Sequence, residues 1–269
     1  MKLIVKADDL GWSDGINAGI EKSVRDGIVT ASGCMTNMPA ARRGIELIQR
    51  YNNVSIGQHT NITVGKPISR PEQIPHLVDK ENNFNSSSYY RKLKKSQEDV
   101  LPYYDEIVIE IEAQLKRFID YAGCRPAFLE GHAIPSKTFE KALKYVADKN
   151  NIIYADARNI NNKYKIFCPP ANEYLLNAIK ENRRYSQFEI NVEEYIINDL
   201  NLILDKETAL LVFHPGFVDS IIMETSSING LRMRECEALC SIRLREWITD
   251  HGVELINYSQ LSDKSETEL

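Results

Sequence analysis

Five segments of the sequence have the pattern of short apolar strands, and each ends in polar side chains that can take part in catalysis. The residues at these ends are Asp8 with Asp9, His59, His132, Asp156 with Arg158, and His214. When helices join parallel strands, the carboxyl ends of the strands meet at the edge where active sites lie. Two carboxylates and three imidazoles at one such edge indicate a metal site with acid–base partners.

The adjacent carboxylates Asp8 and Asp9 directly follow the apolar run of the first strand. Consecutive strand residues point to opposite faces, but a bend at Gly11 would turn both carboxylates toward one cavity. One of them would then bind a cation while the other stays free as a base. The structural alternative is a helix N-cap or a turn. Asp14 suits that role better, and two carboxylates after a buried strand would be costly without compensation.

Two histidines, His59 and His132, each close a predicted strand just after a glycine, at Gly57 and Gly131. A glycine there indicates a turn or a close approach of the backbone. A lone histidine is more often structural than a ligand, but two at equivalent strand ends beside an Asp pair indicate a metal site. One carboxylate and two imidazoles commonly hold a catalytic divalent ion. Imidazole favours zinc or another transition metal, while the carboxylate leaves magnesium open.

A third histidine, His214, lies in the motif FHPGF, where the following proline favours an extended backbone. A histidine opposite the metal could protonate a leaving group, because its ordinary pKa lies near the working pH. The structural alternative is a histidine that merely shapes a turn.

Two arginines are candidates for supporting roles. Arg158 follows Asp156 by two residues, so both side chains could face one side. Arg158 could orient Asp8 or bind substrate oxygens. Arg232 and Glu235 lie near the start of the last predicted helix. They could contact substrate or simply form an exposed helical pair.

Strands and helices alternate along the chain. Strands are predicted near 1–10, 29–39, 54–62, 127–132, 152–158, 209–216 and 253–261, and helices near 13–27, 41–51, 103–123, 136–150, 192–204 and 232–250. Repeated βα units and this length predict a single α/β domain, an irregular, TIM-barrel-like (β/α) barrel over residues 1–262. A long loop excursion is expected at about 65–105, and 263–269 as a solvated tail. No G-x-G-x-x-G motif follows the first strand, which argues against a dinucleotide-binding sheet.

Composition narrows the class of protein. The net charge of −5 argues against a nucleic-acid partner. No run of about 18 apolar residues and no signal-peptide pattern is present, so we expect a cytoplasmic protein without a membrane span. The five cysteines are scattered, without a C-x-x-C pair. Cys236 and Cys240 could share a metal, but we interpret them as lining a buried helix face.

Four motifs, in order, resemble the YdjC-like family of carbohydrate deacetylases, which includes chitooligosaccharide deacetylases. They are KADDLG, GQHTN, PAFLEGH and FHPGFVD, the last followed by SSINGLRMRECEAL. The resemblance implies a deformed (β/α) barrel, one divalent metal ion, and removal of N-acetyl groups from small amino sugars or oligosaccharides. It also makes a homodimer plausible.

The resemblance also implies a role for each matching residue. Asp9, His59 and His132 correspond to the metal ligands, and Asp8 corresponds to the general base. His214 fits a histidine that assists as an acid or stabilises the oxyanion.

Three positions depart from the family pattern. The family often carries alternating histidines after its second metal histidine, where this chain has Ile134 and Ser136. Glu130 stands where the family frequently has Asp. These differences concern substrate preference more than metal binding. Glu130, Arg158 and Arg232 are candidates for supporting or substrate-binding roles.

We therefore predict metal-assisted amide hydrolysis of N-acetylated amino sugars or short chitooligosaccharides, with zinc or magnesium as the cofactor. One alternative is another metal-dependent barrel hydrolase that acts on a phosphoester or a non-sugar amide. A second, from a different class, is a sugar-binding protein without activity, although the four residues of the predicted centre are all present.

Overall fold

The computed structural model describes residues 1–93, 99–170 and 186–261. Its strands are β1 (Lys2–Leu10), β2 (Ala31–Cys34), β3 (Ser55–Thr60), β4 (Phe128–Gly131), β5 (Ile153–Tyr154), β6 (Ile166–Phe167), β7 (Thr208–Phe213) and β8 (Glu254–Leu255). All eight belong to one parallel sheet in the order β5-β4-β3-β2-β1-β7-β6, with β8 paired to β1. The predicted tail at 263–269 lies outside the described residues.

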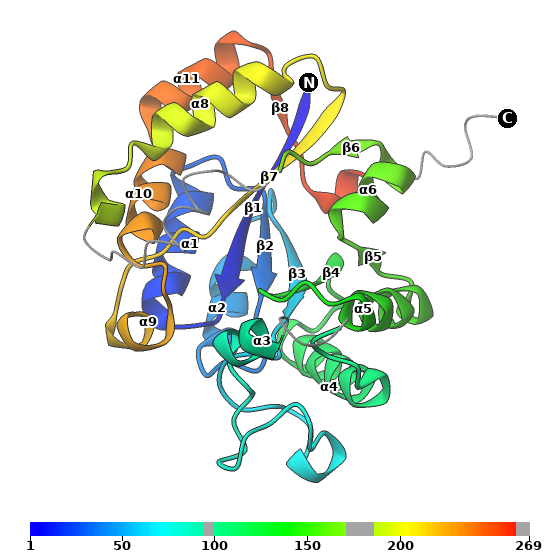
Figure 1. Cartoon of the computed structure of the whole chain (residues 1–269). Helices are drawn as coiled ribbons and strands as arrows, with labels where there is room; N and C mark the ends of the chain where they lie inside the picture. The colour runs from blue at the N-terminus through cyan, green and yellow to red at the C-terminus, as the bar shows by residue number, and fades with distance from the viewer. Residues whose placement is uncertain (94–98, 171–185, 262–269) are drawn as a thin grey trace, which may run out of the picture.

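The sheet curls into a barrel that stays open. Among the described residues no ladder joins β5 to β6, so the curled sheet has two free edges. Helices cover its outside (Figure 1). This arrangement confirms the prediction of a single α/β domain built on an irregular (β/α) barrel. The exact domain limits, 1–262, stay a prediction.

Five of the six predicted helices lie within three residues of their predicted ends, and three further short helices of the described residues were not predicted. The helices are α1 (Asp14–Arg25), α2 (Ala41–Ile48), α3 (Ser87–Leu93), α4 (Tyr104–Ala122), α5 (Lys137–Asn150), α6 (Ala157–Tyr164), α8 (Val192–Ile203), α9 (Ser220–Thr225), α10 (Gly230–Leu239) and α11 (Ile242–Asp250). Ser13 caps α1 and Ser136 caps α5 through their side-chain oxygens, and Gly123 ends α4 in the left-handed region at φ 70°. None of the described helices has the length and apolar content needed to cross a membrane.

The single helix predicted over 232–250 is wrong, because the structure divides it into α10 and α11. The chain leaves the helix at Cys240, and the hydroxyl of Ser241 accepts a hydrogen bond from the backbone N–H of Leu244, 3.0 Å away. A serine side chain that satisfies a free N–H starts a new helix more readily than it continues an old one.

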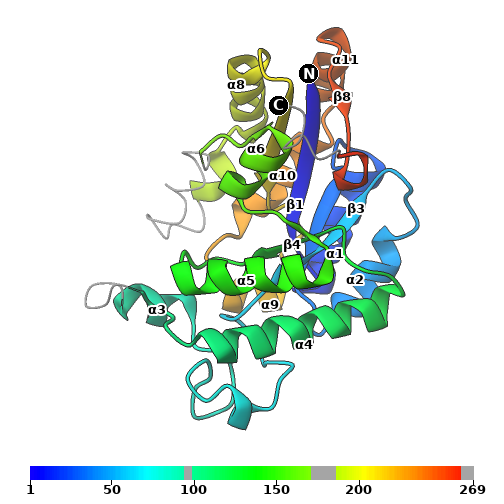
Figure 2. The same cartoon turned by 90° about the vertical axis from the view of Figure 1, so that its right-hand side faces the viewer.

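Where a long excursion is predicted at about 65–105, the described residues 65–93 and 99–103 carry α3 and a short 3-10 turn, η1 (Pro71–Gln73), and are otherwise largely irregular. The buried carboxylate of Glu110, on α4, accepts hydrogen bonds from the backbone N–H groups of Ile68 and Ser69 at 3.0 and 2.9 Å. Figure 2 shows α4 and α5 side by side, with part of the excursion below them and α3 at their left. The excursion is therefore fastened to the barrel. Residues 94–98 of this segment, two of which are lysines, lie outside the described residues.

One close approach inside the barrel has a measurable consequence. A Cβ atom at Gly57, on β3, would lie 2.3 Å from the Cε2 atom of Phe128, on β4. Replacing Gly57 with Ala should therefore lower the free energy of unfolding by about 1–3 kcal/mol, the usual cost of overpacking. Thermal and denaturant unfolding would measure the loss.

The Phe128→Leu variant supplies the control for this clash. The double variant should be more stable than the sum of the two single losses implies, because the smaller side chain removes the opposing ring atoms. Strictly additive losses would show that the ring does not limit the space at Gly57.

Candidate metal centre and active site

A local irregularity in β1 turns both aspartates toward the same cavity. Ala7 pairs with Ser32 and Leu10 with Cys34, so three steps along β1 match two along β2. Asp9 takes up the extra residue with a positive φ of 75°. Such a backbone is costly for a residue other than glycine and often marks a functional site. The predicted bend near Gly11 thus begins at Asp9 itself.

Three donor atoms from three strand ends form a small triangle. Asp9 Oδ1 lies 3.6 Å from His59 Nε2 and 3.3 Å from His132 Nδ1, and the two histidine nitrogens lie 3.1 Å apart. Ligand bonds of about 2.0–2.1 Å around a tetrahedral zinc ion place neighbouring donors roughly 3.3 Å apart. Asp9 Oδ1 is buried and accepts no hydrogen bond within the described part of the chain. The donors therefore fit one divalent ion.

A second layer of charged side chains orients two of these ligands. Arg232 Nη2 donates to Asp9 Oδ2 at 2.8 Å, which leaves Oδ1 for the ion. Although burial opposes it, the guanidinium of Arg232 holds the pKa of Asp9 well below its usual range. Glu130 Oε1 lies 3.1 Å from His59 Nδ1. Because a carboxylate only accepts, Nδ1 carries the proton and Nε2 faces the ion.

Asp8 stands beside this triangle as a separate carboxylate. It is buried, and its Oδ1 lies 3.2 Å from the ammonium of Lys6. Burial, together with the nearby charge of Glu130, raises the pKa of Asp8. A raised pKa suits a group that must take a proton. Lys6 itself is buried and also donates to Glu130 Oε2. Burial would lower the pKa of Lys6, but the charges of Asp8 and Glu130 raise it, so Lys6 stays protonated.

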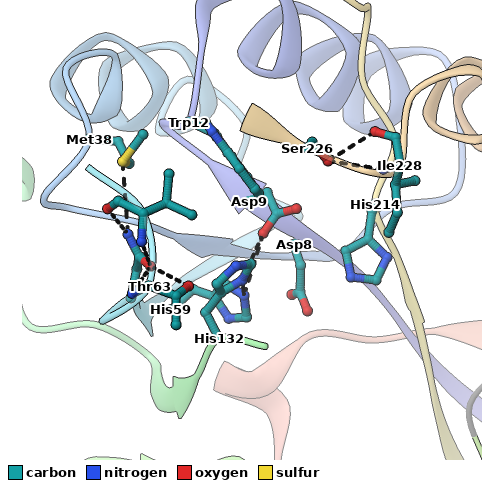
Figure 3. Close-up of polar contacts among 12 residues, drawn as sticks. Asp8, Asp9, Trp12, Met38, His59, Thr63, His132, His214, Ser226 and Ile228 are labelled. Atoms are coloured by element: carbon teal, nitrogen blue, oxygen red, sulfur yellow. Dashed lines mark hydrogen bonds and ion pairs between the residues drawn. The ribbon is translucent and has the colours of Figure 1, made fainter. Parts of the chain in front are cut away.

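His214 lies on the far side of Asp8 from His59 and His132. Figure 3 shows Asp8 between His214 and the pair His59 and His132. His214 follows β7, and its backbone N–H donates to the carboxylate of Glu235, on α10. Its Nδ1 is buried without a hydrogen bond in the described chain. Burial lowers the pKa of His214 to about 4, so the ring is neutral near pH 7.

A cavity of about 530 Å³, a volume typical of small-ligand sites, is lined by Asp8, Asp9, His59, His132, His214 and Arg232. Further polar side chains of its lining come from the segment after β3, from the excursion and from the segment after β7; they are Thr63, Ser86, Ser87, Ser88, Arg91, Glu224, Thr225, Ser226 and Ser227. The indole of Trp12 contacts the ring of His132 edge-on, with centroids 5.5 Å apart. A polar wall with one aromatic surface suits a hydroxyl-rich ligand.

The sequence matches the family described as YdjC-like protein over residues 2–250. The chain belongs to the YdjC-like family. Three curated relatives of this YdjC-like protein match over nearly their full length. Carbohydrate deacetylase 2 of Listeria innocua is 28% identical, covering 98% of this chain and 100% of the relative. A carbohydrate deacetylase of Halalkalibacterium halodurans is 30% identical (93% and 99%), and a chitooligosaccharide deacetylase of Salmonella typhimurium is 29% identical (93% and 95%).

Solved structures support the same fold. A protein of Enterococcus faecalis, described as a candidate cellobiose-phosphate cleavage protein, has a TM-score of 0.74 at 24% identity, covering 96% of this chain and 97% of that chain. A variant of the peptidoglycan deacetylase PdaC from Bacillus subtilis has a TM-score of 0.50 at 11% identity, covering 96% and 88%. At these identities the likeness concerns the fold alone.

The structure of this YdjC-like protein brings most of the predicted site residues together. Those that line the cavity are Asp8, Asp9, His59, His132, His214 and Arg232, and Glu130 contacts His59 beside it. The alternative of an exposed pair of Arg232 and Glu235 is wrong, because both side chains are buried.

Arg158 does not join them. Strand β5 is only two residues long, and Asp156 caps α6 by accepting from the backbone N–H groups of Arg158 and Asn159, each at 3.1 Å. The Arg158 side chain is exposed on the first turn of α6. The sequence suggested that Arg158 could orient Asp8. In this structure Lys6 contacts Asp8 instead.

The departures from the family pattern and the cysteines have structural explanations. Ile134 packs partly buried against the apolar cluster beneath α4 and α5, and Ser136 caps α5. Cys236 is buried against α1 and Cys240 is half-buried, as expected for the lining of a helix face.

Sequence reasoning missed Lys6 and the position of Arg232 behind Asp9. A signal for Lys6 existed, because it is a charged residue inside an apolar strand, two positions before Asp8 and hence on the same face. No local pattern connects Arg232 to Asp9, which lies 223 residues away.

The contact between Arg232 and Asp9 yields a testable expectation. Replacing Arg232 with Met should weaken zinc affinity by about 10–100-fold, because Asp9 loses the donor that fixes its orientation. Competition with a chelating dye would measure the affinity. Arg234→Met, on the same helix but directed to the surface, is the matched control. Unchanged zinc affinity in Arg232→Met would exclude the orienting role.

Proposed function

We propose that the protein is a metal-dependent carbohydrate N-deacetylase that removes acetyl groups from N-acetylated amino sugars or short chitooligosaccharides. The observation that carries this proposal is the triangle of Asp9 Oδ1, His59 Nε2 and His132 Nδ1, with the carboxylate of Asp8 beside it. Membership of the YdjC-like family and the names of the curated relatives support the sugar as substrate.

The side chains divide the chemistry of amide hydrolysis among them. Asp9, His59 and His132 would hold a divalent ion, which when bound supplies Lewis-acid chemistry. Asp8 takes a proton from the water that adds to the acetamide carbonyl carbon. The C–N bond then breaks, giving acetate and a free amine. His214 is neutral at rest, so it must gain a proton during the reaction before it can pass one to the departing nitrogen.

The donor set bears on the choice of metal. Two imidazole nitrogens and one carboxylate favour zinc or another transition ion over magnesium. We therefore propose zinc first, with magnesium as the alternative. The homodimer and the cytoplasmic setting stay predictions.

The decisive experiment measures acetate release from N-acetylglucosamine and from its short β-linked oligomers, with the metal-free protein and after addition of Zn²⁺, Mg²⁺, Mn²⁺ or Co²⁺. We expect release only when a divalent ion is present. The same preparations are offered a p-nitrophenyl phosphoester and a non-sugar acetamide. Turnover of either of these without any sugar deacetylation would support the alternative hydrolase. Sugar binding without turnover under every metal would indicate a non-catalytic binding protein.

A further inference from the structure

A second group of possible ligands overlaps the metal centre. One donor atom each from Asp8, His59 and Glu130 lies within 4.8 Å of the other two, and all three residues are buried. The backbone leaves space for them at Gly33, where a Cβ atom would lie 2.9 Å from Glu130 Oε1 and 3.2 Å from Asp8 Oδ1. Asp8 and Glu130 thus place two buried carboxylates beside the triangle, and carboxylate oxygens are common ligands of divalent ions.

The ammonium of Lys6 lies inside this second group. Its Nζ is 3.2 Å from Asp8 Oδ1 and donates a hydrogen bond to Glu130 Oε2. The side chain is only 4% exposed, and its Nζ lies 5.6 Å from the centre of the Phe128 ring. Glu130 uses its other oxygen, Oε1, for His59. Lys6 therefore contacts both carboxylates of the second group from a buried position.

We propose that Lys6 occupies the place of a second metal ion and so restricts the centre to one ion, which leaves Asp8 free of coordination. This inference rests on the proposed function, because it needs the first ion. A lysine ammonium is a compact positive charge that can lie between two carboxylates. It has no coordination site for a water, so it neutralises the carboxylates without adding a second metal-bound water. Lys6 is accordingly a positioning residue for Asp8 and Glu130.

Removal of the ammonium should convert the one-ion centre into a two-ion centre. Lys6→Ala leaves two buried carboxylates without their cation, a costly arrangement, and opens the space that the side chain filled. A second divalent ion would relieve both. We therefore expect one ion per chain in the natural protein and two in Lys6→Ala.

The experiment reconstitutes metal-free protein with Mn²⁺, removes excess ion by gel filtration, and counts bound ions by elemental analysis. Electron paramagnetic resonance then tests whether two ions lie close enough to couple their spins. Lys2→Ala is the matched control, because Lys2 is an exposed lysine on the same strand. We expect one uncoupled ion in the natural protein and in Lys2→Ala, and a coupled pair in Lys6→Ala.

Two further variants keep the test decisive. Lys6→Gln removes the charge and shortens the side chain, and its amide oxygen can itself bind an ion, so it should also gain a second ion. It serves as the second test if Lys6→Ala does not fold. The double variant Lys6→Ala/Glu130→Gln removes one carboxylate along with the cation and should return to a single ion. In Lys6→Ala, kcat should fall by about 10²-fold or more while KM changes little, because the base loses its position.

The outcomes separate this inference from the proposed function. A natural protein that binds no divalent ion contradicts the proposed function. A natural protein with one ion, together with Lys6→Ala and Lys6→Gln variants that also bind one, contradicts the role of Lys6 alone. Two ions in the natural protein contradict it as well.

Discussion

Replacing Asp8 with Asn should lower kcat for sugar deacetylation by about 10²–10⁴-fold, the usual contribution of a positioned general base. Asparagine keeps the volume of Asp8 but cannot take a proton from water. Because Asp9, His59 and His132 are unchanged, the variant should still bind one divalent ion, and KM should stay within a few-fold. Initial rates of acetate release over a range of sugar concentrations would give both constants.

Glu130→Gln is the matched control for this result. It leaves Lys6 with one carboxylate and keeps the proposed base, while its amide oxygen can still accept the hydrogen bond from His59. We expect a clearly smaller loss of turnover than in Asp8→Asn. Equal losses in the two variants, with one ion bound in each, would contradict proton transfer as the specific role of Asp8. Near-normal turnover in Asp8→Asn would show that Asp8 is not the base.

The convergence of the main site residues could be predicted because it depends on topology. Parallel strands with helical connections bring their carboxyl ends together, so polar residues at the ends of β1, β3, β4 and β7 had to meet. The alternation of elements established that topology from local patterns alone. The same reasoning does not define how far each strand extends. It therefore failed at Arg158, where β5 ends after two residues and Asp156 begins a helix instead.

The supporting contacts could not be predicted because they join residues that are distant in sequence. Lys6 and Glu130 are 124 positions apart, and Asp9 and Arg232 are 223 apart. Such contacts depend on side-chain direction and burial depth, which periodicity does not encode. The φ of 75° at Asp9 could not be predicted from local patterns either, since it arises from a shift in register between β1 and β2. In the proposed function, these three features determine which oxygen of Asp9 would bind the ion and why Asp8 would stay free.

Removing a ligand of the triangle should abolish both metal binding and activity. In His132→Ala the ion keeps two of its three donors, so zinc affinity should fall by more than the roughly 10–100-fold that an outer-shell partner is worth. A chelator should inactivate the natural protein, and added Zn²⁺ should restore its acetate release but not that of His132→Ala. His76→Ala is the matched control, because His76 is an exposed histidine of the excursion that pairs with Glu106.

Unfolding supplies a readout of the same ligand set that does not depend on catalysis. An ion that binds only the folded chain adds about 2.7 kcal/mol to the free energy of unfolding at a hundred times its Kd. The natural protein and His76→Ala should therefore gain thermal stability from Zn²⁺, whereas His132→Ala should gain little at the same concentration. The three donors come from separate strands, β1, β3 and the end of β4, so a bound ion cross-links the barrel at its carboxyl edge. An equal gain in His132→Ala would place the ion elsewhere and contradict the triangle as its site.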